Sequence, residues 1–181
     1  MATISTLRPN VTRAEALEEF HRGLSGFLRR ARWGVLRSIA EAYVPFRLYR
    51  VEIVSGAVPQ VSWFALDAVS GSLDLYQFDH RPEETELVRV ETRNRPSSTL
   101  DDALAVRLLE DKIQRLIFQT GFFRVRHLQI RAELIPLDLH VPYWIGFYGR
   151  DETPRLHVMD AVRRRCEGAK ARAFFERWLA G

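Results

Sequence analysis

The segment YVPF at residues 43–46 returns as HVPY at residues 140–143, and each copy leads into a stretch rich in branched and aromatic residues. A second pair of matching segments follows downstream, LDAV at 66–69 and MDAV at 159–162. The offsets are 97 residues for the prolines (142 minus 45) and 93 residues for the aspartates (160 minus 67). A helical pattern precedes each copy. The spacing therefore predicts an internal duplication, in which a unit of one helix and one antiparallel hairpin occurs twice.

Hydrophobic periodicity around these segments predicts both helices and strands. Helical spacing covers 13–22 and 26–42 (two helices or one weakened helix), 99–120 and 161–179. Strands are expected over 46–54, 60–66, 72–78 and 86–92, from 125 to 143, and over 155–159. Thr12 and Glu15 have the spacing of a capping box at the start of the first helix. A change of phase at Ile135-Pro136 predicts a β-bulge in the long strand.

Length and composition indicate the fold class. The chain has 181 residues, of which 46% are hydrophobic and 11% aromatic, which suits one domain with a substantial core. We therefore predict an α+β fold in which residues 1–181 form a single domain and helices cover an antiparallel sheet. The two half-repeats are expected at about 12–95 and about 98–181.

The turn after the first hairpin, LDAVSGSL at 66–73, resembles the strand–Asp-Ala-x-Ser/Thr-Gly-x-aliphatic turn of PepSY-type modules. The resemblance covers the helix and hairpin of each half. The second copy departs from it, because Arg163-Arg164-Arg165 stands in place of the Ser-Gly turn. PepSY-type modules pack a helix on a small antiparallel sheet in a cystatin-like way, and they are associated with binding and regulatory roles. The resemblance thus implies a binding or regulatory module.

Asp67 and Asp160 are the most suggestive acidic residues, because each ends an expected strand at an equivalent place. Two such carboxylates could form a catalytic dyad or hold a divalent cation. The alternative is structural, with an Asx turn from Asp67 to Gly71 and a helix N-cap at Asp160. We favour the structural alternative, since turn and cap residues are common and dyads are rare.

No pattern in the sequence is typical of a catalytic, metal or cofactor site. It contains no nucleophile elbow, no P-loop and no Gly-x-Gly-x-x-Gly motif, and its five histidines lack metal-ligand spacing. The single cysteine, Cys166, excludes an intramolecular disulfide and is expected on the buried face of the last helix. We therefore predict no catalytic residue, no metal and no cofactor.

Aromatic residues are dense in the segment YWIGFY at 143–148, which is apolar on both alternating faces. A sheet with one wet face would instead alternate apolar with polar residues. One face belongs to the core, and the other must meet a helix, a partner or a ligand. We predict that a partner or a second copy binds this surface, which consists of Phe46, Tyr49, Tyr143, Trp144 and Tyr148; cover by a helix of the same chain is the competing explanation.

The net charge of +4 and the pI of 9.6 rest on arginine, because Lys112 and Lys170 are the only lysines. Basic residues are interleaved with acidic ones along the chain, so nucleic acid is not the expected partner. A group of arginines around Trp33 could instead bind an anionic surface. The sequence shows neither a secretory signal pattern nor ~20 consecutive apolar residues, which predicts a cytoplasmic protein with no transmembrane segment.

Three functions follow from these patterns. We rank first a non-catalytic binding or regulatory module of the bacterial cytoplasm that acts through a protein partner or by self-association as a homodimer. The alternative is a small enzyme or small-molecule-binding protein with a cone-like cavity between the sheet and the helices. The third is a protein that binds an anionic surface, for which binding should weaken steeply with salt.

Overall fold

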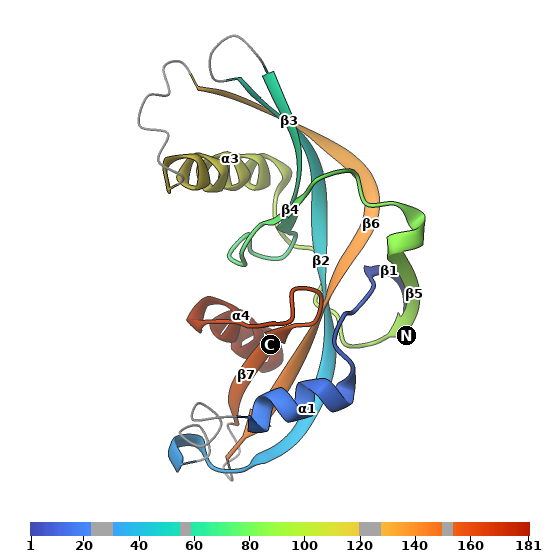
Figure 1. Ribbon diagram of the computed structural model, residues 1–181, viewed down its shortest axis with the longest axis vertical. Helices are drawn as coiled ribbons and strands as arrows, with labels where there is room; N and C mark the ends of the chain where they lie inside the picture. The colour runs from blue at the N-terminus through green and yellow to red at the C-terminus, as the bar shows by residue number, and fades with distance from the viewer. Residues whose placement is uncertain (23–30, 55–58, 120–127, 150–153) are drawn as a thin grey trace.

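The computed structural model describes residues 1–22, 31–54, 59–119, 128–149 and 154–181, and within them helices pack against a tall, curled sheet (Figure 1). The α-helices are α1 (Arg13–His21), α3 (Asp102–Gln119) and α4 (Ala169–Ala180), and a short 3-10 helix, η1, spans Glu84–Glu86. The strands are β1 (Ala2–Leu7), β2 (Leu36–Val54), β3 (Pro59–Asp67), β4 (Tyr76–Phe78), β5 (Leu87–Thr92), β6 (Gln129–Tyr148), β7 (Arg155–Asp160) and β8 (Arg165–Cys166). The predicted α+β class is confirmed.

The strands form one mixed sheet in the order β4-β3-β2-β6-β1-β5, with β7 paired to β6 and β8 paired to β7. The parallel pair is β1 with β6, which meet at Thr6 and His140. The other pairings are antiparallel. The prediction of a purely antiparallel sheet is therefore wrong at β1, a strand that the periodicity did not indicate.

The two long strands β2 and β6 form the spine of the sheet and pair over nearly their whole length. Their register shifts once in the middle, where Phe46 lies opposite Leu139 but Leu48 lies opposite Ile135. The additional residues on β6 include Pro136, which has no N–H to offer a ladder. The predicted bulge is confirmed at this place, and the spine bends along its length in Figure 1.

Helices α1 and α4 cover opposite faces of the sheet at one end of the spine. The ring of Tyr143 packs 5.4 Å from that of Phe175 on α4. The next residue, Trp144, points to the other face, where its indole N–H donates to the carbonyl of Val11 at 3.0 Å. Alternation along β6 thus gives each face its own helix, which is why this strand is apolar on both sides.

Helix α1 begins at the predicted capping box. The hydroxyl of Thr12 accepts from the N–H of Glu15 at 3.3 Å, and the carboxylate of Glu15 accepts from the N–H of Thr12 at 2.7 Å. The helix approaches β6 closely at Gly146, where a Cβ atom would lie 3.0 Å from the ring of Phe20. A larger residue at 146 would push this helix away from the sheet.

Helix α3 covers the other end of the spine. Asp101 precedes it and accepts a hydrogen bond from the N–H of Leu104 at 3.0 Å, as an N-cap residue does. Its apolar stripe meets residues of β2 and β3, and together they form a buried cluster of Tyr49, Val51, Phe64, Leu66, Leu100, Ala105, Leu109 and Ile113. In Figure 1, α3 and α4 lie on the same side of the sheet, one above the other, with the chain between β3 and β4 near the gap.

Three predicted elements differ from the structure. Residues 36–42 were expected in a helix and belong to β2, because pairing with β6 overrides the helical spacing of the apolar residues at 36 and 39. The strand expected over 72–78 is reduced to β4. The last helix starts at Ala169 rather than 161, because a turn and β8 follow Asp160, and Cys166 accordingly lies half-buried in β8.

Candidate functional site

The five aromatic residues that were predicted to bind a partner lie in the core. Phe46, Tyr49, Tyr143, Trp144 and Tyr148 have exposed fractions of 3%, 2%, 3%, 7% and 2%. Helix α1 of the same chain covers Trp144, which was the competing explanation. The predicted aromatic docking surface is therefore wrong, because these side chains leave almost no area for a partner to touch.

Asp67 is fully buried and organises the turn that follows β3. Its Oδ1 accepts hydrogen bonds from the N–H groups of Val69, Ser70 and Gly71 at 3.2, 2.7 and 3.0 Å, and its Oδ2 accepts from the N–H of Leu73 at 2.8 Å. Gly71 has a φ of +66°, which glycine adopts without steric cost. This is the Asx-type turn that the sequence indicated, and main-chain N–H groups use the whole carboxylate.

Asp160 is also fully buried and forms a similar turn after β7. Its Oδ1 accepts from the N–H groups of Val162 and Arg163 at 2.9 and 2.8 Å, and its Oδ2 accepts from the hydroxyl of Tyr76. Burial, together with nearby Tyr143 and Asp160, raises the pKa of Tyr76, so the phenol keeps the proton that it donates. The predicted helix N-cap is wrong, since α4 begins nine residues later at Ala169 (169 minus 160).

A groove of about 530 Å³ opens between α3 and α4, beside these turns. Five of the side chains that line it are cationic, namely Lys112, Arg115, Arg163, Arg165 and Lys170. The remaining lining residues are Asp74, Leu75, Leu116 and Gln119. Five positive charges against one negative charge leave the lining at +4 (5 minus 1), although the charges of the whole chain are nearly balanced.

Arg163 is held at the groove by the turn that Asp160 organises. Its guanidinium lies over the ring of Tyr76, with Cζ 3.7 Å from the ring centroid, and it donates to the carbonyl of Leu75. Its Nε is 4.0 Å from the Asp160 carboxylate. A guanidinium stacked on an aromatic face and fixed by hydrogen bonds is oriented before any ligand arrives.

Arg165 forms ion pairs with two carboxylates at the groove. Its Nη2 is 3.1 Å from the carboxylate of Asp74 and 3.0 Å from that of Glu167. The hydrogen bond to Glu167 raises the pKa of Arg165, while burial raises the pKa of Glu167. Asp74 is thus already paired, and it leaves the other cations of the groove without a neutralising carboxylate in the lining.

Lys112 extends from α3 into the groove and donates to the carbonyl of Leu73. Burial lowers the pKa of its amine; Asp67 and Asp74 act in the opposite direction, and the positive charges of Lys170 and Arg115 lower it further. The amine is therefore half-desolvated, with two carboxylates and two cations near it. An anion placed in the groove would add a negative charge and favour the protonated amine.

Arg115 and Lys170 are exposed on the two helices that flank the groove. Within the described ranges, neither makes an ion pair with a carboxylate. A smaller pocket of about 310 Å³ adjoins the groove at the start of α4 and shares Asp74 and Lys170 with it. Among the described residues, the lining offers five cations and the amide of Gln119, a set of donors that suits binding of an anion.

Sequence reasoning missed this groove because its residues come from distant segments of the chain. Lys112 and Arg115 lie on α3, while Arg163, Arg165 and Lys170 lie about fifty residues later, beyond β6 and β7. One signal was available: in a chain whose other basic residues are arginines, both lysines line the same groove. In the part of the chain that the structure describes, no three His, Cys, Asp or Glu side chains gather as metal ligands would.

Comparison with known proteins adds no assignment: no family model, no curated protein and no solved structure matches this chain significantly. Among the described residues, none of the helices has both the length and the apolar character that crossing a bilayer requires.

Proposed function

We propose that the protein is a non-catalytic binding or regulatory module whose groove between α3 and α4 binds an anionic ligand or an acidic segment of a protein partner. The observation that supports this proposal is the gathering of five cationic side chains around about 530 Å³ with one carboxylate, which Arg165 already occupies. Placing like charges together costs free energy in the unliganded protein. Such an arrangement is usual where a negatively charged ligand supplies the missing charge.

The cations of the groove fall into two groups, one held in place by the protein and one exposed. Arg163 is pre-oriented by Tyr76 and the carbonyl of Leu75, so a ligand does not need to order it. Arg115 and Lys170 are exposed and adaptable, and they can close on the ligand from the two helices. The groove offers little apolar surface, since Leu75 and Leu116 are the apolar residues among those that line it. This mixture suits a carboxylate-rich peptide with an occasional apolar residue, or a phosphate-bearing molecule.

We also propose that the groove lies between two related halves. In the first half the N–H of Ala68 donates to the carbonyl of Pro45 at 2.8 Å, and in the second the N–H of Ala161 donates to the carbonyl of Pro142 at 3.1 Å. These are the prolines and the Asp-Ala-Val segments of the predicted duplication. Because α3 follows the first hairpin and α4 follows the second, the repeated unit in this proposal is a hairpin with the helix after it, and not the helix with the hairpin after it that the sequence suggested. The duplication, the PepSY-type resemblance and a role in the cytoplasm support one picture, a regulatory module that senses a ligand at the joint between its halves.

The alternative, an enzyme or small-molecule-binding protein with an enclosed cone-like cavity, has less support. Large side chains fill the space between the sheet and both helices. Among them are Leu109 and Ile113 of α3 and Phe174 and Phe175 of α4, all at most 3% exposed. The open groove therefore remains the better candidate for a binding site.

Binding of two anionic probes would test the proposal. A fluorescein-labelled hexaglutamate peptide, followed by anisotropy, and inorganic pyrophosphate, followed by calorimetry, represent the two ligand chemistries. We expect at least one to bind, with affinity that falls steeply as salt rises. The double variant Arg115→Gln/Lys170→Gln should weaken binding by at least about tenfold, because two of the five groove cations are lost.

The matched control is Arg107→Gln/Arg177→Gln, which removes two exposed arginines from the same helices outside the groove lining. Both pairs lower the net charge from +4 to +2 (4 minus 2), so long-range attraction changes equally. The control should alter affinity by less than about twofold, as expected for exposed charges remote from a site. Equal weakening by both pairs, or no binding of either probe at low salt, would contradict the proposal.

A further inference from the structure

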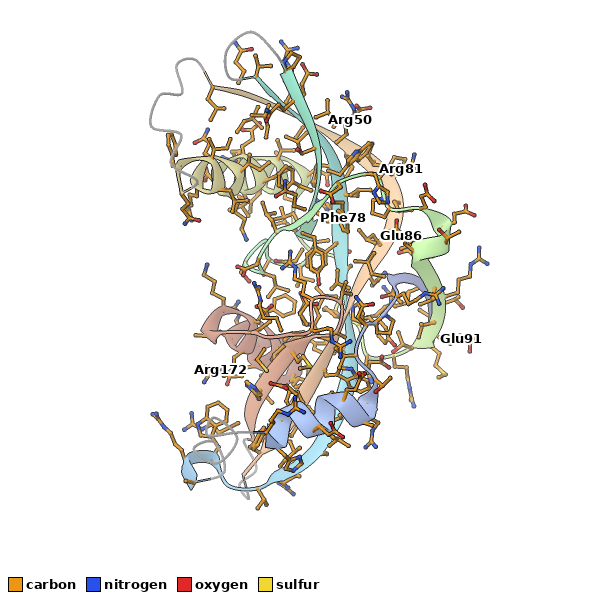
Figure 2. All side chains as sticks on the ribbon, viewed as in Figure 1. Arg50, Phe78, Arg81, Glu86, Glu91 and Arg172 are labelled. Carbon is orange, nitrogen blue, oxygen red and sulfur yellow. The ribbon has the colours of Figure 1, made fainter. Side chains whose placement is uncertain are left out.

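The last strand at one edge of the sheet, β5, pairs with β1 and has no strand of the described residues on its other side. In Figure 1 it lies on the far side of the molecule from α3 and α4. Figure 2 shows Glu91, near its end, directed away from the sheet. An open edge strand of six residues is a template on which another strand can pair.

The hydrogen bonds that surround β5 fix which of its main-chain groups point outward. The N–H of Arg8 donates to the carbonyl of Glu86 at 3.0 Å, and these residues continue the β1–β5 register by one step. Bonded and non-bonded pairs alternate in an antiparallel ladder. Residues 88, 90 and 92 therefore turn their main-chain groups toward β1, whereas Arg89 and Glu91 turn theirs away from it.

The opposite strand agrees with this assignment. Ser5 lies opposite Arg89, and its N–H donates to the carboxylate of Asp138 at 3.0 Å, on the side of β1 that faces β6. A residue of β1 that bonds toward β6 cannot bond its partner on β5. Within the described ranges, the outward N–H groups of Arg89 and Glu91 donate no hydrogen bond and their outward C=O groups accept none. Four main-chain groups are thus available to another strand.

The charges on β5 select one way of pairing with a second copy. Both outward main-chain groups of Arg89 and Glu91 are available, whereas the N–H of Leu87 already donates to the carbonyl of Glu84. Pairing Arg89 and Glu91 with the same two residues of a second copy allows three centred registers. Arg89 would face Arg89 in the first and Glu91 would face Glu91 in the second, and like charges directly opposite are destabilising. In the third, Arg89 faces Glu91 of the second copy, and symmetry repeats this pair on the other side of Val90.

We propose that two copies of this chain associate through β5 in the third register, antiparallel and centred on Val90. Four main-chain hydrogen bonds and two Arg89–Glu91 ion pairs join the copies, and the two sheets become one continuous sheet. Val88 then lies opposite Thr92 of the second copy, so the β-branched residues of this face of β5 meet one another across the joint. The grooves between α3 and α4 stay open, because they lie away from this edge. The dimer does not depend on the groove having a ligand.

Disulfide trapping tests the register. The two Val90 residues form a non-hydrogen-bonded pair in the proposed dimer, with Cα atoms about 4.5 Å apart, which is within disulfide reach. In a Cys166→Ser background, Val90→Cys should give a covalent dimer upon mild oxidation. Val88→Cys in the same background should not, because Val88 faces Thr92 and the two introduced thiols are too far apart. Equal trapping of both variants, or of neither, would overturn the proposed register.

Charge exchange tests the interface without a covalent bond. Sedimentation equilibrium of the native protein should give a mass that rises with concentration toward twice 21.0 kDa. Arg89→Glu and Glu91→Arg should each raise the dimer dissociation constant by at least about tenfold, since each places like charges opposite one another. The double exchange Arg89→Glu/Glu91→Arg should restore the dimer. A native protein that is monomeric at every concentration, or a double exchange no better than the single variants, would overturn the proposal, and the first result would leave the edge to a strand of another protein.

Discussion

The turns at Asp67 and Asp160 share a backbone and differ in their side chains. In each, the aspartate ends a strand, is fully buried, and accepts hydrogen bonds from the N–H groups two and three residues later. Four residues after each aspartate the chain turns through a positive φ, +66° at Gly71 and +56° at Arg164. The same local geometry thus arises from a Ser-Gly pair in one place and from consecutive arginines in the other.

The difference lies in where the second carboxylate oxygen and the turn side chains go. At Asp67 the Oδ2 accepts from the N–H of Leu73, and the turn is closed upon itself. At Asp160 the Oδ2 accepts from the hydroxyl of Tyr76 on β4, and Arg163 reaches the carbonyl of Leu75. The turn at Asp67 is self-contained, whereas the turn at Asp160 is bonded to the segment around Tyr76 and supplies cations to the groove. Changes at the first should therefore alter stability, and changes at the second should also alter binding.

The largest expected effect is that of Asp67→Ala. Four N–H groups lose their acceptor, two of them buried and two half-buried, and each costs roughly 1 kcal/mol when left unsatisfied, so the free energy of unfolding should fall by about 4 kcal/mol. Urea denaturation followed by tryptophan fluorescence measures it. Asp101→Ala is the control, because it removes one exposed helix-capping acceptor and should cost about 1 kcal/mol. A loss at Asp67 no larger than that at Asp101 would show that the turn is not organised by its carboxylate.

Gly71→Ala should have the next largest effect, about 2 kcal/mol of destabilisation. The positive φ is strained for alanine, and its Cβ would lie 2.6 Å from Cδ1 of Leu108. At the equivalent place of the second turn, Arg164→Gly should change stability by less than about 1 kcal/mol. Relief of strain there offsets the loss of the hydrogen bond to Asn10 and the exposed ion pair with Glu15. Equal and large losses in both variants would contradict the claim that the turns share only a backbone.

Tyr76→Phe tests the contact between β4 and the Asp160 turn and should cost about 1 to 2 kcal/mol, because the buried Asp160 carboxylate loses a donor. The ring at position 76 remains and still holds Arg163. Anion binding should nevertheless weaken, because the Asp160 carboxylate beside Arg163 loses the hydrogen bond that stabilised its negative charge and therefore repels an anion more strongly. Tyr49→Phe is the control, because it removes the hydroxyl of a buried tyrosine that does not line the groove. It should leave anion affinity unchanged.

How far the sequence predicted this molecule depends on the range of the interactions. Local signals were sufficient for the Thr12–Glu15 capping box, the turn at Asp67 and the bulge near Pro136, because neighbours in the chain determine each. Pairing between distant strands decided the rest. Residues 36–42 joined β2 and the first residues became β1 only because β6 lies between them. The groove could not be predicted for the same reason, since β6, β7 and β8 separate Lys112 from Lys170 in the sequence.

A smaller effect, on the pH dependence of stability, distinguishes Tyr43 from His140, which lie at corresponding places in the two YVPF-like segments. Both are buried; burial raises the pKa of Tyr43 and lowers that of His140, whose Nδ1 approaches the carbonyl of Ser5 at 3.2 Å. Because the folded-state pKa of His140 lies below its ordinary value near 6.5, the unfolded chain binds the proton more readily. Its contribution to stability is full above about pH 6.5 and is lost as pH falls toward the folded-state pKa, at no more than about 1.4 kcal/mol per pH unit.

Denaturation curves between pH 5 and 8 for the native protein and for His140→Gln check this prediction. The difference in the free energy of unfolding between the two proteins should shrink as pH falls, because only the native protein has a buried imidazole at position 140 to protonate. Asp138 and Arg95, which act on the pKa of His140 in opposite directions, are unchanged in both proteins. Parallel pH profiles would contradict the assignment.

The groove can be tested most directly at the two lysines, because the chain has no others and both line it. Selective ¹³Cε labelling of lysine gives two NMR signals, which Lys170→Arg assigns. Titration of the free protein should show the pKa of Lys112 below the ordinary value, since burial and the neighbouring cations lower it. Saturating pyrophosphate or hexaglutamate should raise that pKa and shift both signals. Signals and pKa values that do not change with either anion, relative to the same ionic strength of chloride, would contradict the account.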